Sequence, residues 1–135
     1  MTKKNVVFAL GYSGYKSSDD LIRLLKSLDV DVLVDIRRFP KSKNPQFTRE
    51  NLAWELSRNG IRYEYMGDIL GGYRRGGYER YMETEEYRRG IEMLLREAEK
   101  GRVAIMCLEK KAKFCHRRFI IRSLSEIGVE VVQIE

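Results

Sequence analysis

The stretch from Val103 to Leu124 concentrates the side chains of this sequence that could do chemistry. Its letters are VAIMCLEKKAKFCHRRFIIRSL, and it holds both cysteines and the only histidine of the chain. An apolar segment typical of a buried strand comes first, and a segment with helical apolar spacing comes last. Ligands of open α/β sheets bind at the C-terminal ends of strands, so we expect the functional site here. Five of its residues are candidates: Cys107, Glu109, Cys115, His116 and Arg117.

Thiol chemistry is one interpretation of this stretch. Cys115 lies near the expected start of a helix, beside His116 and Arg117. Such a setting lowers the pKa of a thiol and produces a nucleophile, although a purely structural Cys115 fits the sequence equally well. Cys107 is expected to be a core residue at a strand end. His116 can transfer a proton near neutral pH or only hydrogen-bond a loop.

Carboxylates support a different interpretation. Asp35 and Glu109 each follow an apolar segment of strand type, and a carboxylate at a strand end can act as a general acid or base. The two could also share a divalent cation such as Mg²⁺. The alternative for Asp35 is a loop cap or an ion pair with a neighbouring arginine. The spacing of Cys107, Cys115 and His116 matches no common zinc site.

Basic and aromatic residues surround these candidates. Arg37, Arg74 and Arg117 are candidates for binding phosphate. The guanidinium fork of arginine forms bidentate, charge-assisted hydrogen bonds with phosphate oxygens. Tyr12 and Ser13 lie next to each other in the segment GYSG, and both could position a substrate. Aromatic side chains beside basic groups are also typical of stacking on bases. The loops of this edge hold further residues of both kinds, namely Arg38, Arg75, Arg118, Phe39, Tyr73 and Tyr78. Alternatively, the aromatic residues pack the loops and the arginines pair with nearby glutamates.

The composition is that of an ordinary soluble protein with an anionic partner. The chain has 135 residues, 43% hydrophobic and 34% charged, and a net charge of +6. This charge favours nucleic acid or a nucleotide as partner, although lysine- and glutamate-rich surfaces also occur in proteins from hot habitats. The apolar run near the N-terminus is too short for a signal peptide or a membrane span. We therefore expect a cytoplasmic protein with free thiols and no membrane association.

The elements that must position the candidates alternate along the chain. Apolar runs predict strands over residues 5–10, 32–36, 103–108 and 129–134, and an alternating pattern predicts a half-exposed edge strand over 61–65. Helices are expected after Ser17, Thr48 and Thr84, which are placed as N-caps, and over residues 116–127. Residues 67–78 form a glycine-rich loop that contains Gly71 and Gly72. A loop of this length in a compact domain is more often functional than idle.

This alternation predicts a single α/β domain over residues 1–135. We expect three α/β/α layers and a mostly parallel sheet of about five strands. In such a sheet the strand-to-helix loops meet at one edge, so candidates that are distant in sequence should converge there.

Several motifs together resemble the family called domain of unknown function 488. The chain carries GYS, LVDIRRFPKSKNPQF, LGGYRR, MCLE and CHR in the family's order, and the resemblance covers nearly all of it. It implies an α/β fold but no agreed activity or cofactor. Ile36 and Lys43 depart from the residues most often seen there. The matching positions are Gly11, Tyr12, Ser13, Asp35, Arg37, Pro40, Ser42, Gly71, Gly72, Arg74, Cys107, Glu109, Cys115, His116 and Arg117.

Three functional hypotheses follow. The first is a hydrolase of nucleic acid or nucleotides, in which Asp35 and Glu109 handle water or a metal, His116 transfers a proton and the arginines hold phosphate. The second is thiol chemistry at Cys115, either sulfur transfer or redox sensing. The third is a non-enzymatic nucleic-acid-binding module, whose binding would weaken steeply with salt.

Overall fold

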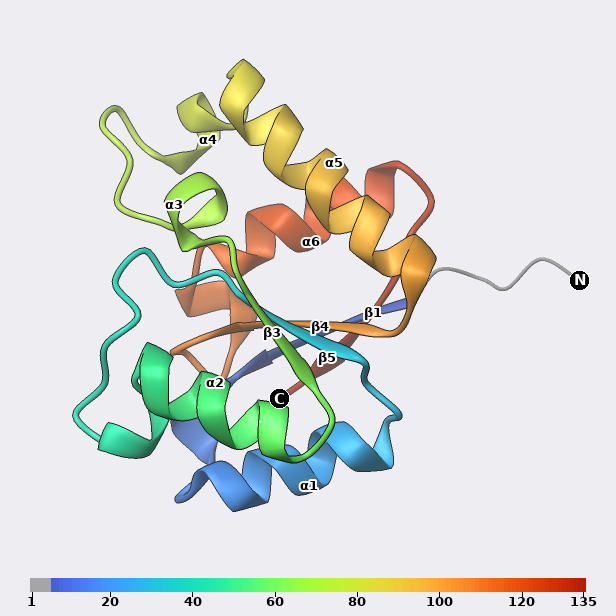
Figure 1. Cartoon of the computed structure of the whole chain (residues 1–135). Coiled ribbons are helices and arrows are strands. Elements are labelled where there is room, and N and C mark those ends of the chain that lie inside the picture. The colour runs from blue at the N-terminus through green and yellow to red at the C-terminus, as the bar shows by residue number, and fades with distance from the viewer. Residues whose placement is uncertain (1–5) are drawn as a thin grey trace, which may run out of the picture.

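The computed structural model describes residues 6–135, which form a five-stranded sheet whose paired strands are all parallel. The strand order is β3-β2-β4-β1-β5. Helices cover both faces of the sheet (Figure 1). The strands are β1 (Val6–Gly11), β2 (Val32–Asp35), β3 (Arg62–Tyr65), β4 (Val103–Cys107) and β5 (Glu130–Ile134).

The register brings the ends of three strands to the same level. β4 lies between β1 and β2, with Gly11 opposite Cys107 and Asp35 opposite Met106. Because these strands are parallel, the segments that follow Gly11, Asp35 and Cys107 emerge side by side at one edge of the sheet. The expected convergence of the strand-to-helix loops is confirmed for these three strands.

Two groups of helices complete the three layers. α1 and α2 lie on one side of the sheet, and α3, α4, α5 and α6 lie on the other (Figure 1). Short 3-10 turns at Tyr12–Gly14, Pro45–Phe47 and Ala112–Phe114 shape the loops between them. The helices are α1 (Ser18–Ser27), α2 (Arg49–Arg58), α3 (Gly67–Leu70), α4 (Tyr78–Tyr81), α5 (Glu85–Lys100) and α6 (Arg117–Glu126).

Alternation of side chains along the strands creates one apolar core on each side. Val7 and Ala9 of β1 pack in the core beneath α5 and α6, while Phe8 and Leu10 pack in the core beneath α1 and α2. Successive side chains of a strand point to opposite faces, so a strand covered on both sides must be apolar throughout. Burial of both faces therefore explains the continuous apolar runs from which the inner strands were predicted.

The expected elements are confirmed with two corrections. The Ser17 hydroxyl accepts a hydrogen bond from the Asp20 amide, and the Thr84 hydroxyl accepts one from the Tyr87 amide, so both caps are present. Thr48 precedes α2 but makes no side-chain cap, because its hydroxyl donates to the Pro45 carbonyl oxygen instead. The glycine-rich segment is not a continuous loop, since α3 lies within it and α4 begins at its end. The expected first strand included Asn5, which lies outside the described residues.

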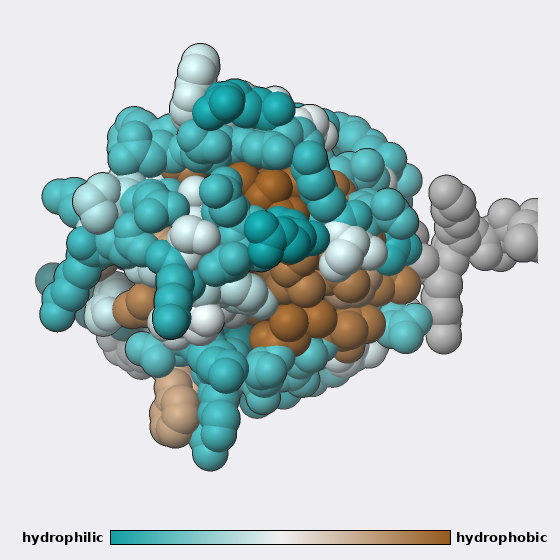
Figure 2. Space-filling model, turned by 90° about the horizontal axis from the view of Figure 1, so that it is seen from below, coloured by the Kyte–Doolittle hydropathy of each residue, from teal (hydrophilic) through white to brown (hydrophobic). Residues whose placement is uncertain are grey.

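The surface seen from below Figure 1 is mostly hydrophilic, with one apolar patch (Figure 2). Within residues 6–135, no helix has the length and apolar character that crossing a membrane requires.

Candidate functional site

Close backbone packing fixes the loops at the C-terminal edge of the sheet. A Cβ atom at Gly11 would overlap the Glu109 carbonyl group, so only glycine lets the chain after β1 approach the chain after β4. The Ser13 amide donates to the Leu108 carbonyl oxygen at 3.0 Å and ties the same two loops together. A Cβ atom at Gly72 would lie 3.1 Å from Nδ1 of His116, so this glycine seats the loop after α3 against the imidazole ring.

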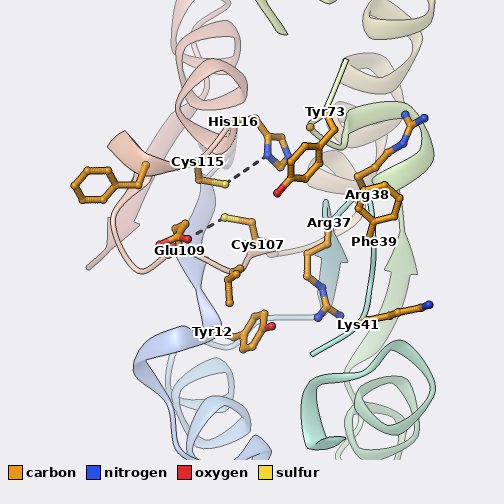
Figure 3. A pocket seen from close by; sticks show the side chains of 13 residues that line it. Tyr12, Arg37, Arg38, Phe39, Lys41, Tyr73, Cys107, Glu109, Cys115 and His116 are labelled. Atoms are coloured by element: carbon orange, nitrogen blue, oxygen red, sulfur yellow. Dashed lines mark hydrogen bonds between the residues drawn. The ribbon is translucent and has the colours of Figure 1, made fainter. Parts of the chain in front are cut away.

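A cavity of about 350 Å³ opens between these loops. This volume is at the lower end of the range of pockets that hold small molecules. Figure 3 shows side chains from the loops after β1, β2 and β4, and from the loop before α4, around it. Its lining residues are Tyr12, Arg37, Arg38, Phe39, Lys41, Gly72, Tyr73, Cys107, Leu108, Glu109, Phe114, Cys115 and His116.

Cys115 lies in the cavity with hydrogen-bond donors around its sulfur. Nδ1 of His116 is 3.5 Å from the sulfur, and the backbone amide of Arg117, the first residue of α6, donates to it at 3.4 Å. Nε2 of His116 is 2.9 Å from the Ile36 carbonyl oxygen. A carbonyl oxygen only accepts, so Nε2 carries a proton and Nδ1 is left to exchange a proton with the thiol.

Cys107 forms the other half of a thiol pair. Its sulfur lies close to that of Cys115 in the cavity, and its thiol also faces the Glu109 carbonyl oxygen at 4.0 Å (Figure 3). One guanidinium nitrogen of Arg117 donates to the Cys107 sulfur at 2.8 Å and to the Glu109 carbonyl oxygen at 2.7 Å, and the other donates to the Lys110 carbonyl oxygen at 3.1 Å. Both cysteines are buried and free.

The electrostatics of this pair favour one thiolate on Cys115. Hydrogen bonding from the Cys107 thiol lowers the pKa of Cys115, burial opposes this, and the hydrogen bond and charge of His116 lower it further. The pKa of Cys107 is raised, chiefly because its thiol donates to Cys115 and secondarily because it is buried. A thiolate at the N-terminus of α6 also interacts favourably with the helix dipole. Of the two sulfurs, Cys115 thus has the surroundings that favour a thiolate, and Cys107 has those that favour the protonated thiol.

Asp35 and Arg37 form a closed ion pair beside the cavity. Nε of Arg37 donates to Oδ1 of Asp35 at 2.8 Å and its NH2 group donates to Oδ2 at 2.7 Å. The Tyr63 hydroxyl donates to Oδ2 at 2.6 Å, and Arg37 also donates to the Phe47 carbonyl oxygen. Asp35 is completely buried and is absent from the cavity lining. The ion pair with a neighbouring arginine, which was the alternative for Asp35, is thus what the structure shows.

The three arginines expected to bind phosphate all have internal partners. Arg74 donates to the Gly71 and Asp68 carbonyl oxygens and stacks on the Tyr81 ring, so it holds the loop in place. Arg37 binds Asp35, and Arg117 is completely buried outside the lining. The phosphate clamp expected from the sequence is therefore not assembled by these side chains.

The remaining candidates divide between the lining and its surroundings. Tyr12 lines the cavity and stacks on Phe47 at 4.6 Å between ring centroids, while Gly72 and the exposed Glu109 also line it. Ser13 and Gly71 lie outside the lining. Among residues 6–135 no group of three or more His, Cys, Asp or Glu side chains could hold a metal ion. With both Asp35 oxygens hydrogen-bonded, Asp35 and Glu109 do not form the shared Mg²⁺ site that the sequence suggested.

The structure places further side chains of the basic and aromatic loops at the cavity. Arg38 and Lys41 line the cavity, and their side chains make no hydrogen bond or ion pair within residues 6–135. Phe39, Tyr73 and Phe114 also line it while being largely exposed. Arg38, Phe39 and Tyr73 are among the basic and aromatic residues that the sequence indicated, whereas Lys41 and Phe114 were missed. The signal that could have found these two is their position: Lys41 follows Pro40 in the basic loop, and Phe114 directly precedes Cys115.

Comparison with known proteins gives one match. The model of the family described as Domain of unknown function DUF488 matches residues 17–124, which include most of the cavity lining. No curated protein and no solved structure matches the chain.

Proposed function

This chain belongs to the DUF488 family, and on that premise we propose that it is a thiol enzyme whose nucleophile is Cys115. The proposed chemistry is attack on a sulfur–sulfur bond, the step that sulfur transfer and thiol redox reactions share. The family description names no activity, so the proposal depends on the geometry of the cavity.

One observation carries the proposal: the Cys115 sulfur lines a cavity between a protonatable imidazole and a helix amide, next to a second thiol. The thiolate is the reactive form of cysteine, and each of these neighbours stabilises it. A core cysteine needs neither a cavity nor a histidine beside it. The arrangement therefore supports a reactive thiol more than a structural one.

The first step uses His116 as the proton donor. The Cys115 thiolate attacks the nearer sulfur of a substrate persulfide or disulfide, forming a new sulfur–sulfur bond to Cys115. The substrate bond breaks, and its electron pair leaves with the distal sulfur. The proton on Nδ1 of His116 passes to that leaving thiolate, and the imidazole becomes neutral. Nε2 keeps its proton throughout because it donates to the Ile36 carbonyl oxygen.

The second step depends on whether the adduct is passed on or resolved. In sulfur transfer, an acceptor nucleophile takes the outer sulfur and releases the Cys115 thiolate. In the redox route, Cys107 loses its proton to water and attacks the Cys115 sulfur, forming the Cys107–Cys115 disulfide and releasing the bound thiolate. Two electrons then pass from the thiol pair to the substrate, and an external low-molecular-weight thiol or dithiol must reduce the pair again.

The test is adduct formation with glutathione disulfide and with glutathione persulfide, read by intact mass and by peptide mapping. We expect a single adduct on Cys115 that forms near neutral pH. In Cys107→Ala the glutathione adduct should accumulate, because the resolving thiol is missing. Cys115→Ala should form no adduct within the same time.

The two single-cysteine variants serve as matched controls for each other. If Cys115→Ala reacts as fast as the unmodified protein, Cys107 is the nucleophile and the proposal fails. If neither variant reacts faster than free cysteine at the same pH, the cavity does not activate a thiol and the proposal also fails. Circular dichroism of both variants establishes that the fold persists.

The hydrolase expected from the sequence has less geometric support, because Asp35 and its arginine are occupied by each other and by Tyr63. Glu109 is exposed at the cavity and would have to act without a second carboxylate. The geometry therefore favours Cys115 over the carboxylates as the reacting group.

A further inference from the structure

Exposed apolar side chains gather at the mouth of the cavity. Of the seven large apolar side chains that are exposed within residues 6–135, four line this one cavity. Their exposed fractions are 84% for Tyr73, 65% for Phe114, 63% for Phe39 and 47% for Leu108. Single exposed apolar residues are normal on a protein surface, but a group around a cavity marks a binding site.

Two of these aromatic rings form a platform. The Phe39 and Tyr73 ring centroids are 5.6 Å apart, and the rings are tilted by 40°. Tyr73 has a positive φ of 59°, an uncommon conformation for a residue other than glycine. Arg74 fixes the chain directly after it through the Gly71 and Asp68 carbonyl oxygens. The platform therefore stands at a fixed place although its rings face solvent.

Positive charge lies on the same side of the cavity as the platform. Arg38 and Lys41 flank Phe39, with their charged ends directed to either side of it, while Glu109 lies on the opposite side of the cavity (Figure 3). Neither Arg38 nor Lys41 has an ion-pair partner within residues 6–135. The neighbouring Arg37, in contrast, is paired with Asp35. An anionic group would be attracted to Arg38 and Lys41 and repelled by Glu109. The cavity thus distinguishes its two sides by charge.

We propose that the substrate presented to Cys115 carries a nucleoside phosphate, whose base stacks on the Phe39–Tyr73 pair and whose phosphate binds Arg38 and Lys41. This inference rests on the proposed thiol chemistry and names its substrate class. A nucleotide combines a planar ring with an anion, and these are the two features that the mouth provides. The net charge of +6 acts in the same direction.

The arrangement also fits in size and direction. A cavity of about 350 Å³ holds one nucleotide unit and not a folded nucleic acid. With the phosphate near Lys41 and the base on Tyr73, the reacting end of the substrate is left to the inner part of the cavity, where Cys115 and His116 lie (Figure 3). The residues at the mouth of the cavity thereby select the substrate, and the Cys115 thiolate reacts with that substrate.

The experiment is calorimetric titration of the reduced protein with the common nucleoside monophosphates, with inorganic phosphate and with a nucleoside alone. A short single-stranded oligonucleotide is titrated in parallel. We expect at least one nucleoside monophosphate to bind more tightly than phosphate or nucleoside. Tyr73→Ala and Arg38→Gln should each weaken that binding about tenfold, since loss of one stacked base or one charged contact has this size.

Matched controls come from exposed residues away from the cavity lining. Trp54→Ala removes another exposed aromatic side chain, and Arg75→Gln removes another arginine of the same loop as Tyr73; both should bind like the unmodified protein. Cys115→Ser should also retain binding, so failure of the thiol chemistry and failure of nucleotide binding are separate results.

The outcomes decide the proposal. Tighter binding of the oligonucleotide, lost in Tyr73→Ala, supports it and identifies a nucleic-acid strand as the source of the nucleotide; preference for the monophosphate supports it with a free nucleotide. The proposal is overturned if inorganic phosphate binds as well as any nucleotide, if Tyr73→Ala binds like Trp54→Ala, or if neither nucleotides nor oligonucleotide bind.

Discussion

Two buried arginines lie beyond the C-terminal ends of neighbouring strands, Arg37 in the loop after β2 and Arg117 at the start of α6, and their counterions differ. Arg37 faces the Asp35 carboxylate with two short hydrogen bonds, so its charge is balanced by a carboxylate that is held in place. Arg117 faces carbonyl oxygens and the Cys107 sulfur, and within residues 6–135 its Nε has no hydrogen-bond partner. The first arginine has a permanent counterion, whereas the second can obtain one only from the thiol pair.

This difference separates structure from reactivity. A buried charge needs a partner, and a carboxylate that supplies it is held in place and removed from chemistry. A thiolate that supplies it remains a nucleophile, because sulfur can leave the contact and form a new bond. The ion pair of Asp35 and Arg37 thus anchors the loop after β2. In the proposed thiol chemistry, the cysteines beside Arg117 are the groups that remain able to react.

Among the variants that test this comparison, the one that removes the Asp35 carboxylate, the counterion of Arg37, should have the largest effect on stability. Asp35→Asn leaves Arg37 buried without a carboxylate, so we expect the free energy of unfolding to fall by about 3–5 kcal/mol. Urea denaturation measures it, and Asp68→Asn on the exposed side of α3 is the control. A loss below about 1 kcal/mol would show that the pair is not the anchor described here.

A smaller loss of stability is expected when the other arginine is removed. Arg117→Met takes away a buried charge together with its hydrogen bonds, and no carboxylate is left unpaired. Since the Glu109 and Lys110 carbonyl oxygens lose their donor, we expect a decrease of about 1–3 kcal/mol. The same variant should react more slowly with iodoacetamide near neutral pH, because Arg117 no longer donates to the Cys107 sulfur, whose thiol stabilises the Cys115 thiolate. A stability loss equal to that of Asp35→Asn, with unchanged thiol reactivity, would remove the distinction between the two arginines.

The thiol pair can be examined through the proton that Cys107 donates. Cys107→Ala removes this donor, so the pKa of Cys115 should rise and its alkylation at about pH 6 should slow by about tenfold or more. Cys107→Ser keeps a hydroxyl donor and should retain most of the reactivity. Above the ordinary pKa of a thiol, Cys115 is ionised in every variant, so the rates should converge there. Equal slowing in both variants would mean that packing, and not the hydrogen bond, sets the reactivity of Cys115.

The smallest effect concerns the imidazole. His116→Gln keeps a polar side chain at this position and removes the positive charge, so the pKa of Cys115 should rise and alkylation at about pH 6 should slow by several-fold. The pKa of Cys115 rises because a charged imidazole stabilises the thiolate, and without that charge the protonated thiol is favoured. The pKa of Cys115 is measured from the pH–rate profile of iodoacetamide alkylation. Each protein also carries Cys107→Ala, so that Cys115 is its one remaining cysteine. A profile identical to that of the unmodified protein would assign His116 to holding Ile36 alone.

The fold was more predictable than the partners of the site. Buried strands must be apolar on both faces, so β1, β2 and β4 were visible as apolar runs, and the alternation in β3 revealed an edge strand. The positions of Cys107, Cys115 and His116 at one edge followed from that topology. The partners of Arg37, Arg74 and Arg117 did not, because a long side chain can reach acceptors on several elements. Exposure of Phe39 and Tyr73 was equally hidden, since an aromatic residue in a loop is apolar in sequence whether or not tertiary structure covers it.

The central position of β4 has a consequence for how the chain is made. β4 pairs with both β1 and β2, so those two strands have no partner between them until residues 103–107 have left the ribosome. During most of synthesis, β1 and β2 therefore present open edges, the condition in which nascent chains associate wrongly. Insertion of β4 joins β1 to β2 and places Cys107 beside the loops of both strands in the same event, while the other edge of β1 is covered only when β5 is added. The thiol pair thus forms late, after most of the chain has been synthesised, and we expect chaperone dependence to fall when β4 is inserted and to end with β5.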